Sequence, residues 1–156
     1  MAIVLLLMFG GGFTSVSFVQ NGLGGSSTKS AVVNVNPTLK VGDLTLNIIS
    51  AASDKDQKKG LSGRDSLPIN QGMLFVFNND APHAIWMKNM RFAIDIFWID
   101  SNKKIIDIAR NVPAEPGKSD KDLKVYTPNT NSRYVLETNA GIASMNNITV
   151  GDTAQF

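Results

Sequence analysis

Residues 92–100, Phe-Ala-Ile-Asp-Ile-Phe-Trp-Ile-Asp, constrain the fold most strongly, because they are apolar at most positions. A strand with one face in water alternates apolar and polar residues, whereas this segment offers apolar side chains to both faces. We therefore expect a central, buried strand. Asp95 lies inside it, and an unpaired buried carboxylate is very unfavourable. The sequence thus predicts a cationic or hydrogen-bonding partner for Asp95.

Short strand patterns recur through the rest of residues 37–156. In residues 43–49 apolar and polar side chains alternate, which is typical of a strand with one face in water. Residues 101–103 provide the turn of a hairpin. Further strands are expected at residues 73–77, 84–88, 104–112 and 133–138 and close to the C-terminus.

Two short helices are expected between these strands. Ser53 has Asp56 three residues later, which is the pattern of a capping box, and Gly60 follows the last turn. Asn139 is expected to cap a second helix over residues 140–145. No long helices alternate with the strands, which argues against a doubly wound α/β fold. The expected fold class is mainly β: a small closed barrel or sandwich of about seven short strands with two short helices.

Composition excludes several classes of function. The chain has 156 residues, of which 43% are hydrophobic and 18% charged, as in globular proteins. It has no cysteine, which excludes disulfides, thiolate catalysis and iron–sulfur clusters, and its single histidine gives no basis for a zinc site. We therefore expect no metal and no cofactor. The net charge of +2 is spread along the chain, so no nucleic acid partner is expected.

The N-terminal segment carries the only information about location. Residues 1–28 contain no charged side chain, and residues 1–19 are mostly apolar. As a helix, about 19 residues would span roughly 28 Å, close to the thickness of the hydrocarbon core. Three interpretations stay open: a membrane anchor, a cleaved signal peptide, or a buried element of the domain. Residues 20–36 are rich in Gly, Ser, Asn and Thr and predict a flexible linker, which leaves 37–156 as the β-rich domain.

Several blocks in series carry a family resemblance. They are Gly60-Leu61-Ser62-Gly63-Arg64, Gln71 to Phe77, Trp86-Met87-Lys88-Asn89-Met90, Ile94-Asp95-Ile96, Arg133 to Glu137, Asn139-Ala140-Gly141 and Val150-Gly151-Asp152. In this order they resemble the bacterial and archaeal family called domain of unknown function 192, from about Leu44 to the C-terminus. The resemblance implies a compact, barrel-like β domain, often behind a signal sequence or anchor, and it implies no reaction. Asn146-Asn147 replaces the family's usual glycine, and Asn tolerates the left-handed conformation of such a turn.

Two groups of residues are candidates for a site. Asp95 is either a structural acid, paired with a cation or with loop amides, or a ligand anchor in a pocket. Trp86 and Asn89 lie close together, and a flat aromatic ring beside a polar amide suits a small polar ligand, although such a ring can equally be core. The candidate ligand-binding residues, none of them assigned as catalytic, are Arg64, Trp86, Asn89, Asp95, Tyr126 and Glu137.

Three functions remain compatible with these residues. The first is a non-enzymatic ligand- or partner-binding accessory module at the cell envelope. Its partners would be the membrane, through the N-terminal segment, and an unknown small ligand or envelope protein. The second is a hydrolase of an envelope substrate that uses Asp95 or Glu137 as acid or base. The third is a purely structural domain in a membrane complex. No nucleophile motif or metal cluster supports the hydrolase, so we expect the first.

The N-terminal segment generates a prediction about location. Because residues 1–28 lack charge, the full chain should pellet with membranes, or be recovered outside the cytoplasm in an N-terminally shortened form. Fractionation followed by N-terminal sequencing measures both. Full-length protein in the soluble cytosolic fraction would contradict both forms of the hypothesis.

Overall fold

A computed structural model describes residues 37–156. The expected anchor or signal peptide, residues 1–19, and the linker, residues 20–36, lie outside this range. Within it, no helix has both the length and the apolar character needed to cross a membrane. The elements are β1 (Thr38–Val41), β2 (Leu44–Ala51), α1 (Asp54–Lys59), β3 (Gln71–Ala81), β4 (Ile85–Trp86), β5 (Ile94–Ile99), β6 (Ile105–Val112), the 3₁₀ turn η1 (Asp120–Asp122), β7 (Val125–Tyr126), β8 (Ser132–Asn139), α2 (Ile142–Met145) and β9 (Ala154–Gln155).

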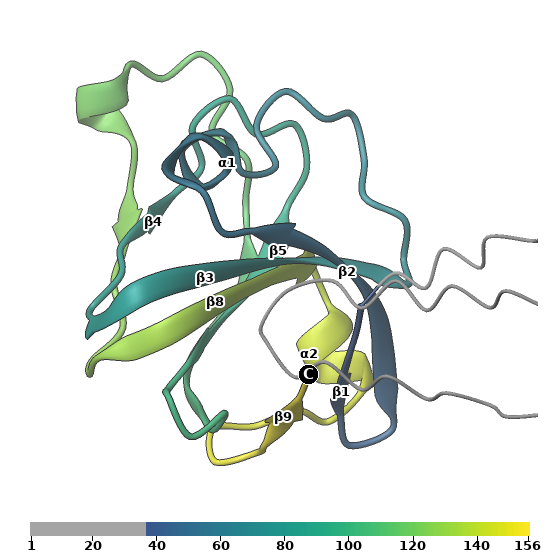
Figure 1. The fold of residues 1–156 in the computed structure, drawn as a ribbon. Helices are drawn as coiled ribbons and strands as arrows, with labels where there is room; N and C mark the ends of the chain where they lie inside the picture. Colours follow the sequence, from purple (N-terminus) through teal and green to yellow (C-terminus); the bar gives the residue numbers. More distant parts are fainter. Residues whose placement is uncertain (1–36) are drawn as a thin grey trace, which may run out of the picture. The chain divides into compact units, whose positions relative to one another are not determined.

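The main sheet has seven strands in the order β6-β5-β8-β3-β2-β1-β9, and β4 and β7 form a separate two-stranded sheet. All neighbours in the main sheet are antiparallel except β2 and β3. A parallel pair needs a crossover connection, and residues 52–70, which include α1, supply it. The crossover places α1 over one face of the sheet, on the same side as β4 (Figure 1).

The main sheet curls but does not close fully. Its edge strands β6 and β9 meet only near one end, at the bridge between Lys104 and Thr153. There the Ile105 amide donates to the carbonyl oxygen of Asp152 at 2.8 Å. β9 is too short to pair along the rest of β6. The mainly β fold with two short helices is therefore confirmed, and the expected closed barrel is corrected to a curled, partly open sheet.

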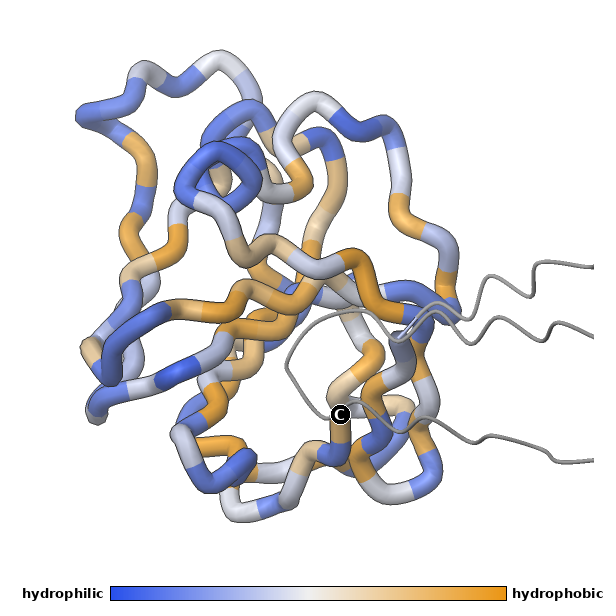
Figure 2. The backbone as a smooth tube through the Cα atoms, viewed as in Figure 1, coloured by the Kyte–Doolittle hydropathy of each residue, from blue (hydrophilic) through white to orange (hydrophobic). Residues whose placement is uncertain are grey.

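The two faces of the sheet pack against separate cores. Every residue of β5 is buried, which confirms a buried strand within the predicted range 92–100, although the strand covers only residues 94–99. The α1-side core includes Ile94, Ile96 and Trp98 of this strand, together with Leu61, Met73, Phe75 and Val135. The α2-side core includes Phe97 and Ile99, together with Leu39, Leu46, Leu74, Leu136 and Ala143. Figure 2 shows apolar residues along the sheet strands and a polar α1 above them.

The caps predicted from the sequence are confirmed at α1, whereas the cap predicted at the start of α2 is not. The Ser53 hydroxyl accepts from the Asp56 amide at 3.1 Å, and Gly60 ends α1 with φ of 48°, as expected. The expected cap Asn139 instead ends β8, where it pairs with Ile94, and α2 begins after Gly141. The correction has a physical reason: continued strand pairing satisfies the backbone of Asn139, and its side-chain amide donates to the carbonyl oxygen of Leu67 at 2.8 Å.

Asp95 is completely buried, and both of its carboxylate oxygens accept backbone hydrogen bonds. Oδ1 accepts from the Asn111 amide at 2.7 Å, and Oδ2 accepts from the Ala143 amide at 2.8 Å. Asn111 lies near the end of β6 and Ala143 in the first turn of α2. The Asp95 carboxylate therefore ties β5 to the end of the neighbouring strand and to the helix below the sheet. The hydrogen-bonding partners predicted for the buried Asp95 are thus two backbone amides, not a cation.

This arrangement predicts a large loss of stability in Asp95→Asn. The new side-chain amide would turn a donor toward one of the two backbone donors and leave it unsatisfied, so the free energy of unfolding should fall by about 3 kcal/mol. Chemical denaturation of the full chain measures the change. Asp43→Asn is the matched control, because Asp43 is an exposed aspartate in the turn before β2 and should change stability little. Equal stabilities of the two variants would contradict the structural role of Asp95.

Candidate functional site

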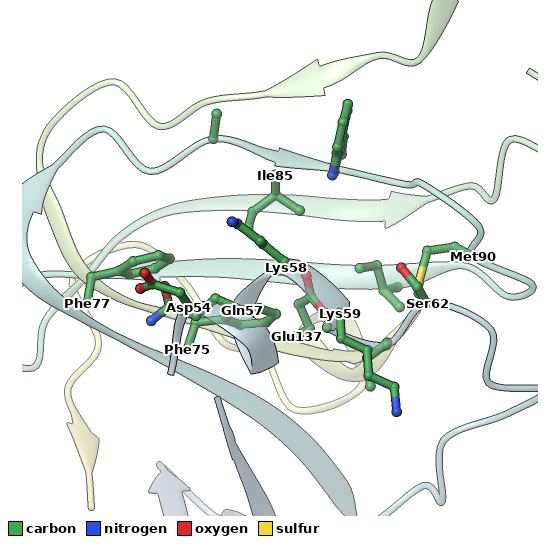
Figure 3. Close-up of a pocket in the computed structure, with 15 residues that line it drawn as sticks. Asp54, Gln57, Lys58, Lys59, Ser62, Phe75, Phe77, Ile85, Met90 and Glu137 are labelled. Carbon is green, nitrogen blue, oxygen red and sulfur yellow. The ribbon is translucent and has the colours of Figure 1, made fainter. Parts of the chain in front are cut away.

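A cavity of about 270 Å³ lies on the α1 side of the main sheet. Figure 3 shows its lining side chains, which come from α1 and the loop after it, from β3 and β4, and from the inner strands β5 and β8. The lining residues are Asp54, Gln57, Lys58, Lys59, Gly60, Leu61, Ser62, Phe75, Phe77, Ala84, Ile85, Trp86, Met90, Ile94 and Glu137.

Strand alternation places the aromatic wall. Phe75 and Phe77 are two residues apart on β3, so both side chains face α1. Their rings stack with centroids 6.4 Å apart, and the Phe77 ring also stacks on His83 at 3.5 Å. Gly60 ends α1 directly against this wall, since a Cβ at that position would lie 3.3 Å from Phe75 Cζ. The short helix can therefore lie over the rings without a side chain between them.

Glu137 is the one acid that the sheet itself contributes to the cavity. It lies on β8 opposite Met73 of β3 and Ile96 of β5, and only 4% of it is exposed. Its Oε2 atom is buried without a hydrogen-bond partner. Burial among apolar neighbours raises the pKa of Glu137 from 4.5 to about 8. At neutral pH the cavity therefore contains a protonated carboxyl group.

The partly buried polar side chains of the lining already form hydrogen bonds with the protein. Gln57 Nε2 donates to the carbonyl oxygen of Val76 at 2.8 Å, and the Ser62 hydroxyl donates to that of Lys88 at 2.7 Å. The charged side chains of the lining, apart from Glu137, all come from α1 and are exposed: Asp54, Lys58 and Lys59. Glu137 is thus the inner polar group of the lining that has an atom left to bond.

The structure brings two of the six candidate residues together. Trp86 and Glu137 both line the cavity, where 45% of Trp86 is exposed. Asp95 does not reach it: Ile96 and Glu137 are paired across β5 and β8, so the neighbouring Asp95 points to the opposite face. Asn89 lines an adjacent, more polar cavity of about 480 Å³, which also contains Ser62 and Met90.

The remaining candidates line neither cavity. Arg64 is exposed in the loop after α1, and Tyr126 pairs with Ile85 in the two-stranded sheet. The aromatic wall was not predicted from the sequence, although the spacing of Phe75 and Phe77 places both side chains on one face of a strand. Within residues 37–156, no three His, Cys, Asp or Glu side chains come together in a way that could bind a metal ion.

Comparisons with known proteins agree with this fold. The model of the family DUF192, described as an uncharacterized ACR, matches residues 37–156. A curated UPF0127 protein from Thermococcus gammatolerans is 28% identical over 86 residues, which cover 54% of this chain and 50% of that protein. The chain thus spans about half the length of the curated relative that it matches.

Two solved structures share the architecture. A protein of unknown function from Novosphingobium aromaticivorans superposes with a TM-score of 0.69 at 24% identity, covering 76% of this chain and 84% of that one. A protein from Sinorhizobium meliloti, provisionally named a transcription regulator, gives a TM-score of 0.68 at 24% identity and covers 76% and 91%. At this identity the similarity is one of fold.

The burial of Glu137 predicts a pH dependence of stability. Between pH 4.5 and about 8 the unfolded chain ionises this carboxyl while the folded chain keeps its proton, so rising pH favours unfolding. As the pH rises through this window, Glu137 should lower the free energy of unfolding by about 1.4 kcal/mol per pH unit. Above the folded-state pKa, a further rise in pH should cause no further loss from this residue. Glu137→Gln should remove this contribution, because an amide does not ionise. Denaturation of both proteins at a series of pH values measures the difference.

Glu115→Gln is the matched control, since Glu115 is the other glutamate of the chain. A hydrogen bond from Lys118 lowers the pKa of Glu115, so its stabilising effect is present above pH 4.5 and is lost only as the pH falls through that lowered pKa. Glu115→Gln should therefore leave the slope between pH 5 and 8 unchanged. A wild-type slope equal to that of Glu137→Gln would show that Glu137 ionises normally.

Proposed function

Because the chain belongs to the uncharacterised family DUF192, we propose its function from the cavity: a non-enzymatic accessory module that binds a small, mostly apolar ligand beside Glu137. The observation that carries the proposal is the buried Oε2 atom of Glu137, which has no partner in the protein. Native proteins pair almost all buried polar atoms, and leaving one unpaired is unfavourable by about 1–3 kcal/mol. A ligand group that bonds this atom would remove the penalty.

The dimensions and lining of the cavity support a small ligand. About 270 Å³ is near the lower end of the range for small-molecule sites, which are mostly apolar and contain a few aimed polar groups. Phe75, Phe77, Ile85 and Ile94 supply the apolar surface here, and Glu137 supplies the polar group. Trp86 stands partly exposed at the same cavity, where a bound ligand would change its surroundings.

A hydrolase is the second candidate, and one observation favours it: a protonated glutamate in an apolar pocket is suited to general acid catalysis. Asp95, the alternative acid or base, gains no support, because its side chain lies on the opposite face of the sheet from the cavity and both of its oxygens are bonded to amides. The other carboxylate along the cavity is the exposed Asp54. A binding role requires Glu137 alone.

The proposed place of action is the cell envelope. The charge-free residues 1–19 support tethering to a membrane or export, and residues 20–36 would then connect that segment to the binding domain. An envelope protein as partner, and a purely structural role in a membrane complex, are the alternatives to a small ligand. They require no access to the cavity, so blocking the cavity distinguishes them.

Ala84→Trp should abolish ligand binding, because Ala84 is exposed at the cavity and a large ring there would fill its opening. The measurement is a thermal-shift screen of the full chain against small aromatic alcohols, amines, acids, sugars and nucleosides, confirmed by fluorescence titration of the wild type. A ligand at 100 times its dissociation constant stabilises the folded state by about 2.7 kcal/mol.

Met145→Trp is the matched control. Met145 is 65% exposed on α2, which packs on the other face of the sheet, so this variant adds the same ring away from the cavity. It should bind as the wild type does. A panel without any binder, or equal binding by the Ala84→Trp and Met145→Trp variants, would argue for a structural domain instead.

A further inference from the structure

The chemistry of the cavity defines the polar end of its ligand. We infer that the ligand binds through a protonated amine that pairs with the carboxylate of Glu137, with its apolar body against the aromatic wall. The inference rests on the proposed binding function and adds the class of ligand to it. Two independent observations carry it: the unpartnered acid inside the cavity, and the rings of Phe75, Phe77 and Trp86 that line it.

The unpartnered acid selects a ligand that donates hydrogen bonds. Gln57 and Ser62, the other inner polar groups, already donate to carbonyl oxygens of the protein, so neither is free to bind an anionic head group. Glu137 forms no ion pair with any Lys or Arg of residues 37–156. Figure 3 shows its carboxyl group turned toward the space that the lining side chains enclose. An ammonium group placed there would supply both the charge and the donors that the protein does not.

The aromatic wall favours a cation over a neutral donor. An ammonium group within about 6 Å of a ring centroid is attracted to the ring face, by roughly 2 kcal/mol where water is excluded. A cation over the Trp86 ring is compatible with the structure, since Lys88 Nζ, which also pairs with Asp120, lies 5.3 Å from the ring centroid. A neutral hydroxyl would gain only an ordinary hydrogen bond, worth about 1 kcal/mol. The cavity therefore discriminates by the charge of the head group.

The other charged residues that line the cavity with Glu137 come from one element. α1 contributes Asp54, Lys58 and Lys59, all exposed at the cavity. The lining residues of β3, β4 and β5 are uncharged, and so are those of the loops. The two lysines disfavour a cation at the opening, but exposed charges are screened by water and salt, whereas the buried pair is not. The amine therefore belongs at the inner end, beside Glu137.

Binding of an amine must release a proton. At pH 7, below its raised pKa of about 8, Glu137 is mostly protonated in the free protein, whereas the ion pair requires its carboxylate. The ammonium of the ligand keeps its own proton, and the proton of Glu137 passes to the buffer, so one proton appears for each ligand bound. A neutral alcohol or a protonated acid bound at the same place would release none. This linkage is a signature that ordinary packing in the cavity would not produce.

The experiment uses three ligands with the same ring and different heads: 2-phenylethylamine, 2-phenylethanol and 3-phenylpropionate. Each is titrated calorimetrically into the full chain at pH 7, in phosphate and in Tris, since the difference in buffer ionisation enthalpy counts released protons. The amine should bind at least about tenfold more tightly than the other two. It should release close to one proton, and its affinity should rise by up to about tenfold per pH unit until Glu137 is ionised in the free protein.

Variants assign the effect to one residue. Glu137→Gln should weaken amine binding by at least about tenfold and abolish proton release. It should change alcohol binding much less, because the amide oxygen of glutamine can still accept a hydrogen bond from the hydroxyl. Glu115→Gln should behave as the wild type. If Asp54→Asn rather than Glu137→Gln removed amine binding, the amine would sit at the exposed acid of α1 and the inference would be overturned.

The outcomes separate this inference from the proposed function. If the alcohol or the acid binds as tightly as the amine, or if amine binding releases no proton, the cavity binds ligands but the amine assignment is wrong. If none of the three ligands binds to the wild type, and the heats measured with the wild type equal those measured with Ala84→Trp and with buffer alone, the binding function itself fails. Tight, proton-releasing binding of the amine that requires Glu137 supports both.

Discussion

The hydrogen bonds from two backbone amides to the buried carboxylate of Asp95 are the constraint on which the rest of the structure depends. A charge inside an apolar strand is tolerated only if donors surround it, and the donors here come from β6 and α2. Asn111 belongs to the adjacent hairpin strand, whereas Ala143 lies 48 residues from Asp95 in sequence, so one side chain joins a local and a distant element. The α2-side core then packs around an anchored helix.

The same two strands place a second acid under opposite conditions. Glu137 lies on β8 beside β5, but strand alternation turns it to the α1 side, where the protein offers Oε2 no donor. Asp95 is stabilised by its surroundings, whereas Glu137 keeps its proton to avoid an unpaired charge. Buried polar groups in native proteins are almost always hydrogen-bonded, and exceptions to this rule are expected at functional sites. An unpaired buried oxygen beside a cavity is such an exception. This contrast is the physical basis for assigning one acid to the scaffold and the other to the site.

Much of the fold could be predicted from local patterns, and the composition of the site could not. Apolar continuity predicted the burial of β5, the Ser53 and Asp56 pair predicted the start of α1, and Asn147, with φ of 53°, adopts the left-handed turn expected of it. The prediction that Asn139 caps a helix was wrong, because this residue pairs with Ile94 in the sheet instead. Which side chains share the cavity depends on which strands pair and in what register. The sequence of one strand determines how its side chains alternate between the two faces, but it does not determine which strand lies beside it. Asp95, Arg64 and Tyr126 were therefore grouped with Glu137, while Phe75 and Phe77 were missed.

The polar character of α1 bears on how fast an occupant exchanges. No residue of this helix is buried, and Gln57 fastens it to β3 by a single short side-chain hydrogen bond, assisted by a longer one to β2. A segment without apolar anchors opens locally at a small fraction of the global stability. For a ligand bound as proposed, the contacts with the inner lining would determine its affinity, whereas local opening of this short helix would determine its residence time. The two properties can be altered separately, because they depend on different parts of the chain.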